Sequence, residues 1–340
     1  MTKQIDEKRL YWIDVIRIVA MMLILCMHSP IPNVGTPGTV LSTLSFLTEP
    51  GIGLFFMISG ALLLGNKMAQ SDFLKHRFSK IVWPTLFWTA VYLTVSFVST
   101  PHTGTCAIAT ILSIPFSAQG HGVLWFMYTL AGLYLLTPIL SKWLAKATRR
   151  DVEFYLILWA ISLLYPYLKL VLTINTSNTG ILYYFTGYCG YFLLGYYMKK
   201  YVIPQGIGKT KVLWSIVAII ACVLVVFVTK KIYSDVNILE LFWYLSMPGA
   251  IMSVAYFLLL SKIKVPNGCK TFVTKLSTLS FGVYLCHILV MRTFLWNIDF
   301  IHNSGAILNI PIVAVLTIIL SWLLAYLISK LPYSKYIVGL

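Results

Sequence analysis

This sequence contains little charge: Asp, Glu, Lys and Arg make up 11% of its 340 residues, whereas soluble domains contain about 25%. Apolar residues reach 59%, and the mean hydropathy is +0.84. A soluble chain of this length cannot bury so much apolar surface, but a lipid bilayer accommodates it. The composition therefore excludes an ordinary soluble domain and favours an integral membrane protein, with the lipid bilayer as its first partner.

Acidic residues are the scarcest charged type, and the formal net charge is +16. Such a basic balance can indicate nucleic-acid binding. Here the cations occur in short clusters between apolar runs, so a role in membrane topology explains them better. We therefore predict no nucleic-acid partner.

The six cysteines form no CxxC pair and show no regular spacing. Most of them lie inside apolar runs, where a free thiol behaves as a small apolar side chain. The sequence therefore predicts neither a metal site nor a disulfide framework. An HExxH motif, a Gly-rich phosphate loop and a nucleophilic serine motif are also missing.

A membrane-spanning helix needs about twenty mostly apolar residues. The first such run resembles a signal peptide but carries Asp14 and Arg17 near its start and lacks a small-x-small cleavage site, so we predict that it is retained. Because the loops are short and no linker or repeat occurs, residues 1–340 are predicted to form one transmembrane domain. We expect an all-α, polytopic bundle of about ten transmembrane helices, at 11–30, 40–64, 79–99, 121–141, 153–173, 180–200, 211–231, 238–261, 272–294 and 306–329.

The distribution of Lys and Arg predicts the orientation of this bundle. With the N-terminus inside, 21 of the 26 Lys and Arg residues fall on the cytoplasmic side and 4 on the outer side, while Arg17 lies within the first helix. Both termini are therefore predicted to be cytoplasmic. The sequence leaves open whether the segment 102–120 forms an interfacial or a re-entrant element.

Three ionisable residues, Asp14, Arg17 and His28, lie in the first predicted helix. At about 100° per residue, Arg17 and His28 share one helical face and are separated by about 16 Å along the axis. Asp14 lies one turn before Arg17, close to the same stripe. Charges within a bilayer usually face a protein interior or a water-filled cavity, so this face is a candidate functional surface. The alternative is an Asp–Arg pair at one membrane edge and a histidine at the other.

Glu49 lies inside the second predicted helix and is followed by Pro50. A carboxylate beside a helix breaker predicts a local opening of the helix into a cavity. The alternative is a shallow interfacial carboxylate at a proline kink.

Aromatic and histidine side chains gather near the outer ends of two further predicted helices. His121, Trp125 and Tyr128 are spaced to share one face, and Tyr284 and His287 lie about one turn apart. Each alone is typical of an interfacial aromatic belt or of a buried core histidine. Together with His28 and Glu49 they form a group whose imidazoles suit proton transfer near neutral pH.

A basic stretch that includes Arg77 and Lys80 precedes the third predicted helix. Such a cluster is typical of a cytoplasmic anchor for the membrane helix. It could also bind the phosphates of an anionic cosubstrate.

These motifs resemble those of the acyltransferase-3 family, bacterial membrane proteins that acylate cell-envelope carbohydrates. The hallmark of the family is an Arg and a His separated by ten residues in the first helix, here Arg17 and His28. One departure is Arg77-x-x-Lys80, where the family often has a second arginine; lysine keeps the charge but lacks the planar guanidinium. The further motifs follow in family order, over roughly residues 11–330, at 53–60, 77–84, 124–128, 132–138, 192–196 and 280–287.

The resemblance implies an acyltransferase, with O-acetyl transfer as the expected reaction, in the bacterial cytoplasmic (inner) membrane. The expected donor is acetyl-CoA, with a succinyl donor not distinguished, and no metal is expected. The expected acceptor is a hydroxyl of a cell-surface polysaccharide or of a lipid-linked sugar. The oligomeric state is left open, a homo-oligomer included.

The resemblance also implies roles for individual residues. His28 is expected to be the general base, with a transient acyl-histidine as the alternative, and Glu49 to orient or acidify that imidazole. Arg17 is expected to act in catalysis by holding the anionic donor. Donor binding is further expected from Asp14, which orients Arg17, and from Arg77 and Lys80. The acceptor side is expected to be lined by His121, Trp125, Tyr128, Tyr284 and His287.

A transporter or flippase for a lipid-linked saccharide is the main alternative, because ten spans with internal charges suit it equally well. Against it, the two halves of the sequence show no inverted repeat and no corresponding pair of broken helices. A scaffold subunit of an envelope synthase is a third interpretation.

Overall fold

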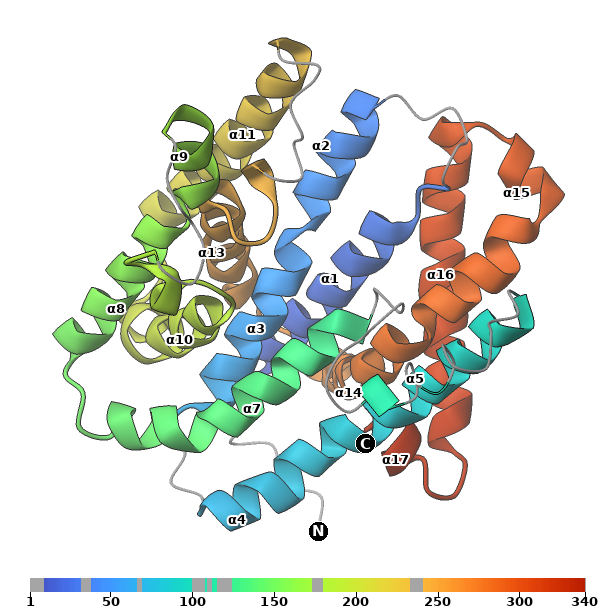
Figure 1. Cartoon of the computed structure of the whole chain (residues 1–340), viewed down its shortest axis with the longest axis horizontal. Helices are drawn as coiled ribbons and strands as arrows, with labels where there is room; N and C mark the ends of the chain where they lie inside the picture. The colour runs from blue at the N-terminus through green and yellow to red at the C-terminus, as the bar shows by residue number, and fades with distance from the viewer. Residues whose placement is uncertain are drawn as a thin grey trace. The chain divides into compact units, whose positions relative to one another are not determined.

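The computed structural model describes residues 9–31, 38–65, 69–99, 108, 112–114, 124–172, 180–232 and 241–339. These residues form helices joined by turns and short loops, with no β-strand among them, which confirms the all-α prediction (Figure 1). His121 and most of the segment 102–120 lie outside the described residues. The longer helices are α1 (Tyr11–His28), α2 (Gly38–Thr48), α3 (Pro50–Leu63), α5 (Ser79–Ser99), α7 (Trp125–Leu144), α8 (Arg149–Ser162), α9 (Tyr165–Val171), α10 (Cys189–Tyr197), α11 (Lys209–Ile232), α13 (Met247–Ser261), α14 (Lys270–Ile288) and α16 (Ala306–Ser329).

Each of the ten predicted segments contains a helix. Helices α5 and α7, with 21 and 20 residues, also have the length of a span. A multi-pass membrane protein is therefore supported, whereas the count of ten spans and the cytoplasmic location of both ends stay predictions. Among the described residues, six helices are long and apolar enough to cross a membrane: Tyr11–His28, Thr43–Leu63, Arg149–Lys169, Lys209–Ile232, Asn267–Asn297 and Ile307–Ser329.

Three predicted spans have other boundaries in the structure. The segment 40–64 forms α2 and α3, because Pro50 has no N–H to continue the helical hydrogen bonds. The segment 153–173 forms α8 and α9, and α9 again has a proline in its first turn. The segment 180–200 begins with the 3₁₀ turn η3, and α10 starts only after Gly187, whose φ of 91° no helix accommodates. Pro and Gly thus divide or delay these helices locally, while Thr43–Leu63 and Arg149–Lys169 each keep the length of a span.

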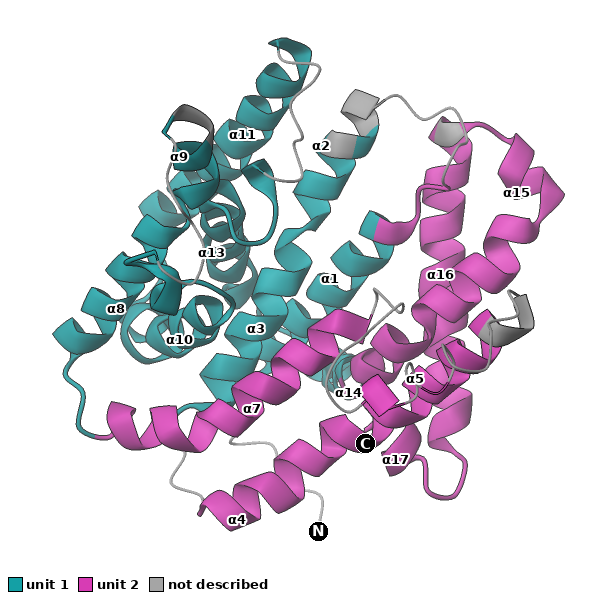
Figure 2. Ribbon diagram, viewed as in Figure 1, with its two compact units in different colours: residues 1–27, 36–64, 146–277 teal, residues 28–35, 65–145, 278–340 magenta. Residues whose placement is uncertain are grey.

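The chain forms two compact units, which Figure 2 shows in different colours. Unit 1 comprises residues 1–27, 36–64 and 146–277, and unit 2 comprises residues 28–35, 65–145 and 278–340. Both α1 and α14 contribute residues to each unit. The prediction of one transmembrane domain stays a prediction.

Within unit 1, α3 packs most extensively against α10. A Cβ atom added to Gly60 would overlap the carbonyl oxygen of Phe192, and one added to Gly195 would overlap that of Met57. The two backbones therefore approach each other at positions where only glycine fits, a packing mode that membrane helices favour.

Within unit 2, the short helix α17 (Lys335–Val338) packs against α5. The indole N–H of Trp88 donates a hydrogen bond to the carbonyl oxygen of Ile337 over 3.0 Å. Gly282 leaves room for Val338, because a Cβ at this glycine would lie 2.9 Å from the valine side chain. Val338 of α17 is thus part of the core of unit 2.

Candidate active site

His28 and His287 lie beside each other in unit 2, although they are far apart in the sequence. His28 is the last residue of α1, and His287 lies in the last turn of α14. Their ring centroids are 5.6 Å apart, and the rings are inclined by 37°. His28 is half-buried and His287 is fully buried. Two residues that the sequence assigned to different roles thus form one imidazole pair.

The backbone of α14 orients the His287 ring. Its Nδ1 atom hydrogen-bonds to the carbonyl oxygen of Tyr284, and since a carbonyl only accepts, Nδ1 carries the proton. The Nε2 atom is then the unprotonated nitrogen, and it is buried with no hydrogen-bond partner among the described residues. The pair therefore contains a buried nitrogen that is able to accept a proton or a hydrogen bond.

Aromatic rings line one side of His287. The Tyr284 ring lies 5.5 Å from His287 and 5.3 Å from Phe126 in α7, measured between centroids. Trp125, the neighbour of Phe126, is half-buried, and its ring centroid lies 6.2 Å from that of Phe126. Tyr284 and His287 thus lie together as predicted, and Trp125 is connected to Tyr284 through the Phe126 ring.

Tyr128, another predicted acceptor-side residue, has its hydroxyl engaged elsewhere in unit 2. It donates a hydrogen bond to the carbonyl oxygen of Ile114 over 2.7 Å and lies 3.5 Å from the hydroxyl of Thr89. Its hydroxyl therefore links α7 to α5 and to the Ile114 turn, and its expected place on the acceptor side stays a prediction.

Arg292 is a charged residue near the imidazole pair that sequence reasoning missed. It lies in the π-helical turn η7 (Leu289–Phe294), acts electrostatically on both His28 and His287, and extends over the Trp296 ring at 5.4 Å. The sequence identifies it only as one of the few cations on the predicted outer side. Its spacing from His287 gives no signal, because a residue five positions further along a regular α-helix lies about 140° around the axis.

A second polar group, in unit 1, surrounds the start of α1. Asp14 is buried and forms a two-bond ion pair with Arg9, at 2.7 and 3.0 Å, which raises the pKa of Arg9. The Ser277 hydroxyl donates to Asp14 over 2.6 Å and accepts from Arg17 Nη1 over 3.2 Å. Asp14 and Arg17 are therefore joined through Ser277, and Arg9 and Ser277 are additions that the sequence did not identify.

Glu49 lies at the junction of α2 and α3, buried within unit 1 with only 1% of its surface exposed. Its Oε2 atom has no hydrogen-bond partner among the described residues, and its Oε1 atom lies against Gly249 in the first turn of α13. The carboxyl acts electrostatically on the hydroxyls of Tyr188, Tyr191 and Tyr244. The carboxyl is thus enclosed by protein, and its depth in the membrane stays a prediction. Its expected partnership with His28, which belongs to unit 2, stays a prediction.

Arg77 and Lys80 are exposed in unit 2. Arg77 lies in the π-helical turn η1 (Leu74–Phe78), and Lys80 lies in the first turn of α5. The turn η1 packs against α7. Their expected grouping with Arg17, which belongs to unit 1, stays a prediction.

The apolar helices fit a multi-pass membrane protein. The chain belongs to the acyltransferase-3 family, because the family model described as an acyltransferase domain matches residues 10–326. No curated protein and no solved structure matches the chain. Family membership confirms the resemblance and gives this protein its class, that of the membrane acyltransferases.

Proposed function

We propose that this protein transfers an acetyl group from cytoplasmic acetyl-CoA to a hydroxyl of a cell-envelope carbohydrate, in the bacterial inner membrane. The acceptor is a surface polysaccharide or a lipid-linked sugar. Family membership supports acyl transfer. The observation that carries the proposal is the imidazole pair of His28 and His287, whose ring centroids lie 5.6 Å apart at the end of α1.

His28 acts as general base in this proposal. It takes the proton of the acceptor hydroxyl while the hydroxyl oxygen attacks the thioester carbonyl. A C–O bond forms, the C–S bond breaks, and the imidazolium returns the proton to the thiolate of CoA. At the last residue of α1, the C-terminal carbonyls of the helix favour the transient positive charge on the ring, whereas the nearby positive charge of Arg292 opposes it.

His287 and Arg292 complete the site on the α14 side. His287 supplies its unprotonated Nε2 as a hydrogen-bond acceptor. Its partner is either the hydroxyl of the sugar or the proton that His28 has taken up. Arg292, which acts electrostatically on both imidazoles, is proposed to stabilise the negative charge on the tetrahedral oxyanion. Such placed charges contribute much of the rate enhancement in enzymes.

Arg17 is proposed to bind the phosphates of CoA, because a guanidinium matches the geometry of phosphate oxygens. Asp14 and Ser277 hold Arg17 in place through the hydrogen bonds described above. Arg77 and Lys80 are proposed to add positive charge for the donor, and no metal takes part.

Replacing Ser277 by alanine is expected to raise the KM for acetyl-CoA more than it lowers kcat, because Arg17 loses the hydroxyl that positions it. Loss of a hydrogen bond to a charged group also lowers the free energy of unfolding by about 1.5–3 kcal/mol. Steady-state kinetics and thermal unfolding in detergent measure the two effects. The matched control is Ser261→Ala, whose hydroxyl bonds only locally to Leu258 O over 2.8 Å; equal kinetic effects in both variants would argue against this role of Arg17.

The proposed function is tested by incubating the purified protein with acetyl-CoA labelled in the acetyl group and with an envelope glycan or lipid-linked sugar. Label on a sugar hydroxyl, together with release of free CoA, is the expected result. Mass spectrometry of the glycan gives the added mass and its position. Transport of the sugar in liposomes without consumption of the thioester would support the transporter alternative instead.

A further inference from the structure

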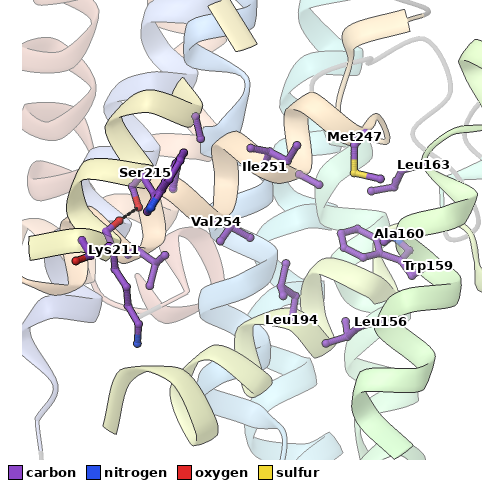
Figure 3. A pocket seen from close by; sticks show the side chains of 16 residues that line it. Leu156, Trp159, Ala160, Leu163, Leu194, Lys211, Ser215, Met247, Ile251 and Val254 are labelled. Atoms are coloured by element: carbon purple, nitrogen blue, oxygen red, sulfur yellow. Dashed lines mark hydrogen bonds between the residues drawn. The ribbon is translucent and has the colours of Figure 1, made fainter. Parts of the chain in front are cut away.

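An apolar groove runs along unit 1 between α8, α10, α11 and α13 (Figure 3). Its volume is about 470 Å³, and all but three of the 16 residues that line it are apolar. Alanines, among them Ala160 and Ala218, leave space between larger side chains such as Trp159 and Leu194. The groove is therefore a preformed hollow in the packing of four helices.

The groove lies on a surface whose composition suits hydrocarbon rather than water. Helices α8 and α11 both belong to candidate membrane spans, and only 17% of the α11 span is buried within the protein. Its exposed surface carries large apolar side chains, such as Leu213 and Trp214 at 61% and 66% exposure. Inside a bilayer, an occupant of such a surface must itself be apolar.

One end of the groove is positively charged. Lys211 is the single charged residue among those that line the groove, and no acidic residue accompanies it there. Its ammonium donates to the carbonyl oxygen of Gly206 over 3.0 Å and extends away from the apolar lining (Figure 3). Lys211 lies in the first turn of α11, a helix of 24 residues, where free N–H groups and the helix dipole favour an anion.

We propose that this groove binds one acyl chain of an anionic phospholipid, with the lipid phosphate at Lys211 and the first turn of α11. The chain supplies the apolar partner that the walls require, and the phosphate supplies the anion that the charged end lacks. This binding site is independent of the proposed acyl transfer.

The test measures binding of phosphatidylglycerol and of zwitterionic phosphatidylcholine to the purified full-length protein by native mass spectrometry. The wild-type protein is expected to bind phosphatidylglycerol about fivefold more tightly, the effect of one lysine near a lipid phosphate. Lys211→Gln should remove this preference. Val254→Phe, which enlarges a side chain in the middle of the groove (Figure 3), should weaken binding of both lipids by a similar factor.

Lys230→Gln, in the last turn of α11, is the matched control and is expected to bind both lipids as the wild type does. Thermal unfolding without added lipid verifies that the variants are folded. Equal affinity of the wild-type protein for the two lipids, or unchanged phosphatidylglycerol affinity in Lys211→Gln or in a folded Val254→Phe, would overturn the proposal.

Discussion

Replacing His28 by alanine is expected to reduce acyl transfer by about 10²–10⁴-fold, the usual contribution of a general base, while the protein stays folded. The reason is that no other group removes the proton of the acceptor hydroxyl in the proposed mechanism. The initial rate of label transfer from acetyl-CoA to the sugar measures the effect. Because the loss is in the chemical step, kcat should fall and the KM for acetyl-CoA should change little.

His302→Ala is the control for this experiment, because His302 is an exposed histidine of the same unit. It should leave the transfer rate unchanged. A well-folded His28→Ala protein with full activity would remove the central assignment. Rapid quenching of the wild-type enzyme with labelled donor and no acceptor separates the two mechanisms, since only an acyl-histidine intermediate would leave label on the protein.

Replacing Gly60 or Gly195 by valine is expected to lower the free energy of unfolding by about 3 kcal/mol or more, the upper range for overpacked cores. Each new side chain would meet backbone atoms of the opposite helix, Phe192 for Gly60 and Met57 for Gly195. Backbone cannot rotate away as a side chain can, so α3 and α10 would have to separate. The yield of monodisperse protein from membranes and its thermal unfolding measure the loss.

Gly132→Ala is the matched control, because Gly132 is also helical but has no atom within 4 Å of an added Cβ. Alanine there should be neutral or stabilise the helix by up to about 1 kcal/mol. If Gly60→Val and Gly132→Ala unfolded at the same temperature, the close approach of α3 and α10 would be wrong.

Features that depend on one stretch of sequence could be predicted. Apolar runs located the helices because bilayer thickness sets their length, and the spacing of Arg17 and His28 placed both on α1. The family could also be identified from the sequence, because its motifs are short and follow one another in order. Boundaries were less accurate where Pro50 or Gly187 interrupts a helix, because hydropathy averages over such residues.

Features that depend on tertiary packing could not be predicted. The sequence groups His28 with His287 but does not predict the contact between their rings, and it does not pair Asp14 with Ser277, because each contact joins distant segments. Arg9 was counted only as a cytoplasmic cation, although it forms the ion pair with Asp14. Charge patterns along a chain predict the side of the membrane, but not which oppositely charged group a side chain will meet.

The packing of α17 bears on how this protein can be handled in the laboratory. Trp88 and Gly282 both contact α17, and Gly339 packs against the Phe281 ring. A purification tag or fluorescent fusion joined directly to α17 without a spacer would compete with these contacts for the same volume. A flexible linker of Gly and Ser residues before the tag should preserve the yield of folded protein, and a direct fusion should reduce it.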